Sequence, residues 1–269
     1  MQHCNRIICL TEETTELLYL LEEDHRIVGV SSFTKRPMIA KKEKPAVCAF
    51  IDGNLAKIEK LNPDLIIGFS DVQADFASRL IRAGYNVLIT NQRSIDEIYS
   101  TMLMIGQLVK KEQETRKLIK SWQNRLSTLH QKYKKAPKIK VFLQEWDEPI
   151  LCGIRWCSEL LTYLGAEHVF SKKSQQAAAA GRVVSKEEVA RKNPDVIIGS
   201  WCGKKMKKKW VKDMPEWQSV NAVQKNNIYE INSTIFLQPG PALFTDGLDE
   251  LERVLSTARA KIGLEAFLA

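Results

Sequence analysis

Short apolar runs alternate with amphipathic stretches along most of the chain. Residues 65–68 and 196–199 are uninterrupted apolar runs, which is typical of strands buried on both faces of a parallel sheet. Arg6–Leu10 is a similar run, and the stretch Thr15–Leu20 after it has the apolar spacing of a helix. The order strand, helix, strand, helix, strand recurs in both halves, and it predicts an α/β fold with parallel sheets covered by helices.

One phrase of the sequence occurs twice. Leu61–Gly68 reads Leu-Asn-Pro-Asp-Leu-Ile-Ile-Gly, and Lys192–Gly199 reads Lys-Asn-Pro-Asp-Val-Ile-Ile-Gly. In each copy a helical stretch ends at Asn-Pro, because proline lacks the backbone donor that a helix needs. A second matching pair, Thr15–Leu20 and Ser158–Leu164, extends the duplication. We therefore expect two Rossmann-like lobes of similar build.

A helical tract lies between the two halves. The tract opens with a capping box at Ser94–Glu97. Further along it lies Gly106, a residue that can interrupt a helix. Its last two dozen residues carry one apolar stripe and, at ~1.5 Å per residue, span roughly 36 Å. The stripe consists of Leu118, Trp122, Leu126, Leu129 and Tyr133. We predict an N-terminal lobe at residues 1–107, a single long connecting helix at 108–137, a C-terminal lobe at 138–269 and a ligand cleft between the lobes.

Composition and charge are those of a folded soluble protein. Of 269 residues, 44% are hydrophobic and 27% charged, and no segment requires a membrane. The formal net charge of +8 comes largely from lysine pairs and the run Lys204–Lys209, which is typical of a solvated helix face. No nucleic-acid-binding module accompanies these lysines, so we predict no nucleic-acid partner. Whether the ligand or a partner is anionic stays an open question.

The first residues predict the compartment. They pass straight into a helical pattern, without the basic start, apolar stretch and cleavage site of an export signal. We therefore expect a cytoplasmic protein. The alternative is a periplasmic protein whose signal has been removed.

Cysteine and histidine spacing argues against a metal site. The six cysteines form no C-x-x-C pair, and a chain of this size builds a core without disulfides. The set Cys152, Cys157 and Cys202 lacks a partnered histidine, and the four histidines are scattered. We expect reduced cysteines, no metal ligands and no required cofactor.

Aromatic side chains follow the predicted strands in both halves. In open parallel sheets, ligands bind beyond the carboxyl ends of the strands. Phe33, Phe69, Trp146 and Trp201 occupy such positions, and Phe50 lies in the loop before the first Asn-Pro helix. A single ring there is more often part of the core, but five in matching positions predict a bulky, partly apolar ligand such as a macrocycle or metal chelate.

Polar candidates near the same strand ends do not suggest catalysis. Asp147 and Glu148 are neighbours in sequence, and neighbours seldom aim at one reacting atom, so we expect loop capping or amide recognition. Gln238, in a Gln-Pro-Gly-Pro turn, is placed to hydrogen-bond a ligand. Phosphate-loop, nucleophile-elbow and dinucleotide motifs are absent, so we predict no enzyme and no catalytic residue. The alternative is a cytoplasmic enzyme or cofactor-assembly factor that uses Asp147, Glu148 and Cys202.

Nearly the whole chain resembles the helical-backbone substrate-binding proteins of ABC importers for cobalamin and ferric siderophores. Residues 28–33, 51–55 and 141–144 carry this resemblance. Three segments are similar to the cobalamin-binding branch in particular, namely 153–160, 199–204 and 237–241. The first of them includes Trp156.

The resemblance implies a corrinoid ligand, either cobalamin or a related compound. It also implies that the aromatic residues form two opposite walls of the ligand site. Phe33, Phe50 and Phe69 would lie against the corrin, with Trp146, Trp201 and Trp210 on the opposite wall. Trp156 and Cys202 join the implied ligand-binding residues.

The resemblance also implies a monomer that delivers its small-molecule ligand to an ABC permease. Members with a known importer dock through one acidic side chain on each lobe. Ala56 stands where the first acid is expected, and Lys204–Lys209 has the opposite charge near the second. An intracellular protein that stores, senses or delivers the ligand is therefore the alternative to an import component.

Overall fold

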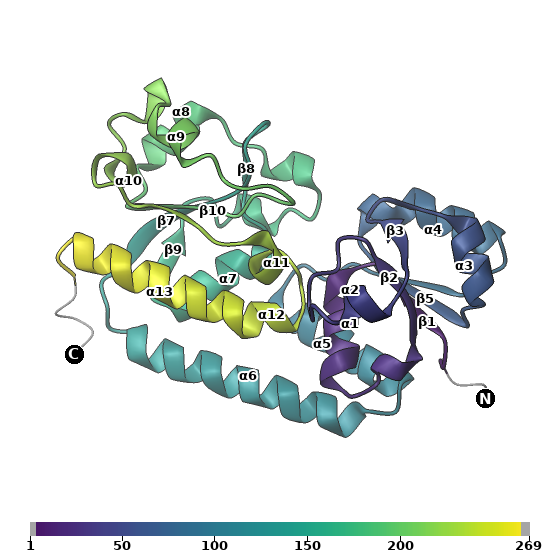
Figure 1. Cartoon of the computed structure of the whole chain (residues 1–269). Helices are drawn as coiled ribbons and strands as arrows, with labels where there is room; N and C mark the ends of the chain where they lie inside the picture. Colours follow the sequence, from purple (N-terminus) through teal and green to yellow (C-terminus); the bar gives the residue numbers. More distant parts are fainter. Residues whose placement is uncertain (1–3, 265–269) are drawn as a thin grey trace. The chain divides into compact units, whose positions relative to one another are not determined.

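A computed structural model describes residues 4–264, and the chain divides into two compact units (Figure 1). Unit 1 comprises the chain up to Gln92, Asp96–Lys120 and Gln238–Pro241. Unit 2 comprises Arg93–Ile95, Ser121–Leu237 and the chain from Ala242 onwards. Each unit contains one mainly parallel sheet covered by helices. The predicted fold class is thereby confirmed, whereas the predicted lobe limits and the cleft between lobes stay predictions.

The sheet of unit 1 has the order β4-β3-β2-β1-β5-β6. All neighbours are parallel except β3 and β4, which are antiparallel. Ile58, Phe76 and Leu80, from helices α3 and α4, pack against one face of the sheet. The strands and α-helices of unit 1 up to its last strand, β6, are β1 (Ile7–Cys9), α1 (Glu12–Leu20), β2 (Ile27–Ser31), α2 (Ala40–Glu43), β3 (Ala46–Ala49), β4 (Asp52–Gly53), α3 (Leu55–Leu61), β5 (Leu65–Phe69), α4 (Ala74–Arg82) and β6 (Val87–Thr90).

The sheet of unit 2 has the order β11-β10-β7-β8, with β9 also paired to β7. Helices α8, α9 and α10 lie on one side of this sheet and α13 on the other (Figure 1). A core of buried rings, including Phe142 and Trp217, fills the α8 side. The strands are β7 (Ile139–Trp146), β8 (Leu151–Cys152), β9 (Ala166–His168), β10 (Val196–Gly199) and β11 (Ile228–Glu230). The helices are α7 (Arg155–Tyr163), α8 (Lys186–Lys192), α9 (Lys208–Lys212), α10 (Asn221–Gln224), α11 (Ser233–Phe236), α12 (Pro241–Phe244) and α13 (Asp246–Lys261).

The repeated Asn-Pro-Asp phrase has the same structural role in both units. Asn62 and Asn193 end helices α3 and α8 in the left-handed region, at φ 41° and 43°, a conformation that asparagine tolerates better than most residues. The aspartate that follows accepts a backbone hydrogen bond at the start of the neighbouring strand. Asp64 accepts from the N–H of Asn5 (2.7 Å) and Arg6 (3.1 Å), and Asp195 accepts from that of Lys140 (3.0 Å).

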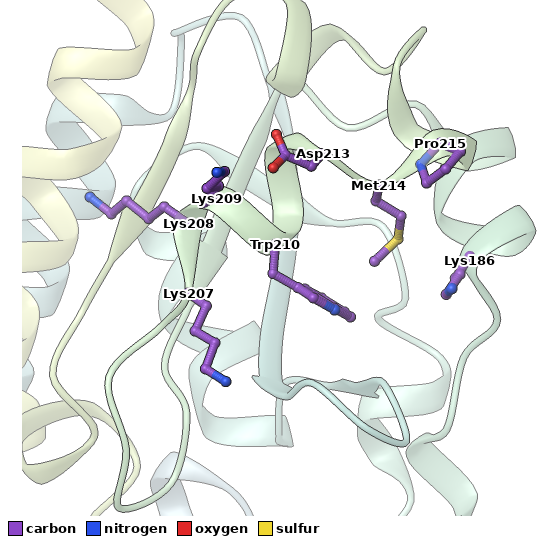
Figure 2. Close-up of a pocket in the computed structure, with 8 residues that line it drawn as sticks. All are labelled: Lys186, Lys207, Lys208, Lys209, Trp210, Asp213, Met214 and Pro215. Carbon is purple, nitrogen blue, oxygen red and sulfur yellow. The ribbon is translucent and has the colours of Figure 1, made fainter.

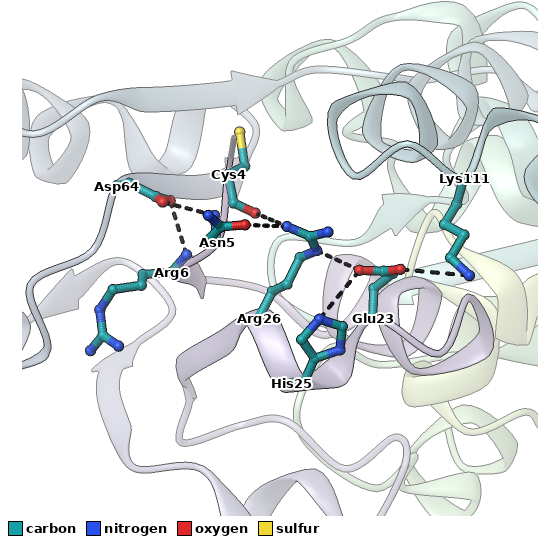
Figure 3. Close-up of polar contacts among 8 residues, drawn as sticks. All are labelled: Cys4, Asn5, Arg6, Glu23, His25, Arg26, Asp64 and Lys111. Carbon is teal, nitrogen blue, oxygen red and sulfur yellow. Dashed lines mark hydrogen bonds and ion pairs between the residues drawn. The ribbon is translucent and has the colours of Figure 1, made fainter. Parts of the chain in front are cut away.

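Figure 3 shows how the first copy of this contact continues into a charged network in unit 1. The Arg26 guanidinium donates to the backbone carbonyl of Cys4 (3.0 Å) and pairs with Glu23. Glu23 is buried and also lies 3.6 Å from the ammonium of Lys111. A buried carboxylate is tolerated when such cations compensate its lost hydration.

The helical tract between the halves consists of two helices, α5 (Ile95–Leu108) and α6 (Glu112–Tyr133). The break falls after Leu108, where Lys110 adopts φ 62°, and not at Gly106. Gly106 lies inside α5, where a Cβ would meet the Thr115 hydroxyl at 2.2 Å, so it permits the close packing of these two segments. In the second half of α6 the predicted stripe is buried, and Trp122 stacks on Phe244 with ring centroids 5.4 Å apart.

Candidate ligand-binding site

Unit 1 exposes a cluster of apolar side chains at the carboxyl ends of its parallel strands. Phe33, after β2, is 58% exposed, and Ile51, after β3, is 62% exposed. Phe50 is half-buried, and Phe69, the last residue of β5, is only 8% exposed. Four exposed residues of these loops were not predicted from sequence as ligand contacts, namely Met38, Ile39, Ile51 and Val72. We call this set of Phe33, Met38, Ile39, Phe50, Ile51, Phe69 and Val72 the apolar edge.

One buried glutamine holds two loops of the apolar edge together. The amide oxygen of Gln73 accepts from the backbone N–H of Phe69 at 2.9 Å, and its amide nitrogen donates to the carbonyl of Phe50 at 2.5 Å. Phe50 has φ 59°, which is costly for an aromatic residue and requires support from its surroundings. Gln73 is fully buried, and its hydrogen bonds fix the loops after β3 and β5.

Acidic residues of α1 anchor the loop that carries Phe33. Glu12 accepts from the backbone N–H of Lys35 at 2.6 Å, and Glu16 pairs with the Arg36 guanidinium at 2.9 Å. Burial raises the pKa of Glu12 to about 7, although the Lys35 hydrogen bond opposes the shift. These contacts position the exposed ring by fixing the backbone on its C-terminal side.

Glu13 is buried beside the segment Gln238–Pro241. Burial also raises the pKa of Glu13 to about 7, against the hydrogen bond at 2.6 Å from the Thr11 hydroxyl. A Cβ on Gly240 would lie 2.4 Å from the Cβ of Glu13, so only glycine fits there. Gln238, predicted to hydrogen-bond a ligand, is half-buried in the same segment.

In unit 2 a charged residue that follows β10 lies over the aromatic ring at the carboxyl end of β7. The ammonium of Lys204 lies 3.8 Å from the ring centroid of Trp146 and 5.2 Å from that of Trp201, within the range of cation–π attraction. Lys204 also pairs with Asp147. Trp146 is half-buried and donates its indole N–H to the Glu148 carbonyl at 2.9 Å.

The two acids of this loop therefore have different surroundings. The Asp147 carboxylate is held by a lysine, while the side chain of Glu148 is exposed and only its backbone contacts Trp146. Glu145, two residues before Asp147, pairs with the buried Arg182. This arrangement stabilises the loop and does not resemble an acid–base pair.

Two of the predicted tryptophans, Trp156 and Trp201, lie in the interior of unit 2, and Trp210 is half-buried beside Trp201. Trp156 is 2% exposed and donates to the carbonyl of Phe236 at 3.2 Å. Trp201 is 1% exposed, and Trp210 packs edge-on against it with centroids 5.9 Å apart. The rings of Trp156 and Trp201 present little surface to a ligand in this conformation, whereas Trp210 packs on the core and stays partly exposed.

Cysteine chemistry is not favoured at this site. Cys202 is exposed as a residue, but burial of its thiol, followed by the nearby Glu145 charge, raises its pKa, which disfavours the reactive thiolate. Among residues 4–264 no cluster of three His, Cys, Asp or Glu side chains is arranged to hold a metal ion. Within the same range, no helix is long and apolar enough to cross a membrane.

Two relatives illustrate the sequence similarity. The chain is 27% identical over 257 residues to an uncharacterized ABC transporter substrate-binding lipoprotein of Bacillus subtilis, covering 91% of this chain and 78% of that protein. It is 26% identical over 238 residues to a vitamin B12-binding protein of Vibrio campbellii, covering 87% and 83%. These alignments extend over most of both proteins.

A solved structure has the same fold. A possible iron-binding, periplasmic solute-binding protein from Staphylococcus epidermidis superposes with a TM-score of 0.79 at 27% identity, covering 93% of this chain and 98% of that one.

These findings correct the predicted compartment and identify the family. The relatives are extracytoplasmic proteins, a lipoprotein and periplasmic binding proteins, so the expectation of a cytoplasmic protein was wrong. A family model described as periplasmic binding protein matches residues 7–234. The resemblance noted in the sequence is confirmed, and the chain belongs to the periplasmic binding protein family.

Proposed function

We propose that this chain is the substrate-binding component of an ABC import system and that its substrate is cobalamin or a related corrinoid. The observation that carries the proposal is the apolar edge of unit 1, where Phe33 and Ile51 remain exposed beside the half-buried Phe50. Large exposed apolar patches of this kind mark binding surfaces. The similarity to vitamin B12-binding proteins supports the choice of ligand.

The chemistry of the apolar edge suits a broad, flat and partly apolar ligand. Phenylalanine rings offer a large contact area and lose little conformational entropy on binding. Burial of one such ring against a ligand contributes roughly 1.5–3 kcal/mol. We propose Phe33, Phe50 and Phe69 as the contacts of unit 1, with Gln238 as a hydrogen-bonding group.

Unit 2 supplies a second kind of surface in this proposal. Trp146 and the Lys204–Asp147 pair combine an aromatic ring, an ammonium group and a carboxylate at one strand end. These groups suit the amide and phosphate substituents of a corrinoid better than its ring.

The proposal includes no catalytic step. Homologues are binding proteins, and the groups named for the enzyme alternative do not form a reactive constellation. Asp147 is paired with Lys204, and the pKa of Cys202 is raised. The enzyme alternative is therefore not favoured. As a component of an importer, the chain would deliver its ligand to a membrane permease driven by an ATPase.

A ligand panel tests this proposal. Purified protein is titrated with cyanocobalamin, cobinamide, haem and a ferric siderophore while tryptophan fluorescence and heat of binding are recorded. We expect saturable binding of both corrinoids. Binding of haem or the siderophore alone would keep the import role but replace the substrate, and absence of binding to all four would refute the proposed function.

A further inference from the structure

A basic groove lies on the surface of unit 2. Its volume is about 690 Å³, and in Figure 2 Lys186 and Lys207 lie on either side of the Trp210 ring. We call it the lysine groove, and it is lined by Lys186, Lys207, Lys208, Lys209, Trp210, Asp213, Met214 and Pro215. Lys186 opens α8 and the other residues follow β10, so both parts lie toward the carboxyl edge of the sheet.

Most of the positive charge of the lysine groove is not neutralised locally, because Lys186 is the one groove lysine that forms an ion pair within residues 4–264, with Glu216 at 3.7 Å. Lys207, Lys208 and Lys209 are exposed, and within residues 4–264 none of them has a carboxylate within ion-pair distance. Nearby, Lys204 is paired with Asp147. Asp213 is the one acid among the groove-lining residues. Like charges held close together repel one another, so an anionic partner would relieve this repulsion.

The floor of the groove is rigid. Trp210 packs edge-on against both Trp201 (5.9 Å between centroids) and Trp217 (6.1 Å). Met214 is buried beneath the groove. The backbone that carries the lysines rests on this packed layer. Binding of a partner would therefore require little ordering of the backbone, which would otherwise reduce affinity.

We propose that the lysine groove docks an acidic polypeptide segment of a partner protein. The surface is concave, which suits a protruding segment better than a flat bilayer. None of the large apolar side chains exposed in the described chain belongs to the groove, so it lacks the apolar anchor of a membrane-inserting surface. Lysine ammonium groups are point charges on flexible stems, and they recognise the charge density of a segment of acids more than one fixed geometry.

This docking surface does not depend on the identity of the transported ligand. The groove shares none of the contacts named in the proposed function, and of the ligand-binding residues that the resemblance implies it contains only Trp210, which the test leaves unchanged. Substitution of its lysines should therefore leave cobalamin titration unchanged, and that titration separates a failure of this proposal from a failure of the proposed function.

The test uses a fluorescein-labelled peptide of ten glutamates as the probe. Its affinity is measured by fluorescence anisotropy in about 20 mM and about 150 mM salt, because exposed charge contacts weaken as ionic strength rises. The groove variant is K207E/K208E/K209E. The control is K57E/K60E/K120E, which makes the same charge change at exposed lysines of unit 1.

We expect the groove variant to lower peptide affinity at least about tenfold and the control to lower it less than about threefold. Equal losses in both variants would show that binding follows net charge alone and would overturn the proposal. Tighter, groove-dependent binding to phosphatidylglycerol vesicles than to the peptide would also overturn it, in favour of a lipid surface. If the charge-reversed chain does not fold, K207Q/K208Q/K209Q removes the charges without adding acids and answers the same question.

Discussion

At the scale of single residues, buried polar side chains determine where the exposed rings lie. Phe50 adopts an unfavourable backbone conformation, and the loops on which it and Phe69 lie are tied together by Gln73. Glu12 and Glu16 hold the loop that carries Phe33. The apolar edge is thus a set of apolar side chains whose loops are held by buried and part-buried polar contacts.

Gln73→Leu should disturb this support. The substitution leaves the N–H of Phe69 and the carbonyl of Phe50 without their present partner, and each loss costs about 1–3 kcal/mol when the group stays buried. We expect a lower free energy of unfolding in urea and weaker ligand binding. Gln113→Leu, at an exposed position of α6, is the control and should change neither. Unchanged stability of the Gln73 variant would mean that the two loops do not depend on this amide.

Glu13 should make stability depend on pH. Its pKa is raised from 4.5 to about 7 in the folded chain, so folding favours the protonated form. Stability is therefore greatest below the unfolded pKa and falls as pH rises from about 4.5 to 7, with a total on the order of 3 kcal/mol for this residue.

Glu13→Gln removes this ionisation and keeps an acceptor for the Thr11 hydroxyl. Urea unfolding at pH 5 and pH 8 should show a smaller decrease in stability for the variant than for the parent chain. Glu12, whose pKa is also raised, in part by the charge of Glu13, still titrates in the variant, so a smaller decrease with pH remains there. An identical decrease in both proteins would contradict the assigned burial of Glu13.

At the scale of elements, the duplicated phrase shows what local sequence determines. Asn-Pro-Asp ends a helix and starts a strand in both units because its residues supply a left-handed turn, a missing donor and a side-chain acceptor. These are properties of neighbouring residues, so the parallel strands and the helices before them were predictable.

The elements that could not be predicted depend on contacts distant in sequence. Gly106 resembles a helix breaker, but its neighbour Thr115 explains it, and the actual break at Lys110 involves a residue with no preference for φ 62°. Rings are equally ambiguous. Phe33 and Trp201 both follow a strand, yet one is exposed and the other belongs to a core, because an apolar side chain suits either place.

The two aspartates of the duplicated phrase should contribute similarly to stability. Asp64→Ala removes two backbone hydrogen bonds, and Asp195→Ala removes one to Lys140 and one from the Asn221 side chain at 3.2 Å. We expect each substitution to lower the free energy of unfolding by about 1–3 kcal/mol. Asp213→Ala, at an exposed position where only the backbone N–H of the residue has a hydrogen-bonding partner in the described chain, should change it by less than about 0.5 kcal/mol. A large difference between the two variants in free energy of unfolding would show that the two copies of the phrase do not contribute equally to stability.

At the scale of the whole molecule, the chain presents two chemically distinct surfaces. The apolar edge belongs to unit 1, and the lysine groove belongs to unit 2. A binding protein of an importer must recognise both a ligand and a partner, and separate surfaces allow each contact to be tuned without loss of the other. Substitutions on the two surfaces should accordingly have independent effects.

The apolar edge makes a prediction about the stability of the whole chain. A ligand that binds only the folded state raises the free energy of unfolding by about 2.7 kcal/mol when its concentration is a hundred times the Kd. Cobalamin should therefore raise the melting temperature of the parent chain in differential scanning calorimetry.

Phe33→Ala should weaken cobalamin binding roughly tenfold or more, because truncation removes most of an apolar contact area. At the same cobalamin concentration its melting temperature should rise less. Ile81→Ala is the matched control, since Ile81 is similarly exposed at 59% but lies on α4. If the two variants respond alike to cobalamin, the exposed ring of Phe33 is not a ligand contact, and the ligand must bind elsewhere on the chain.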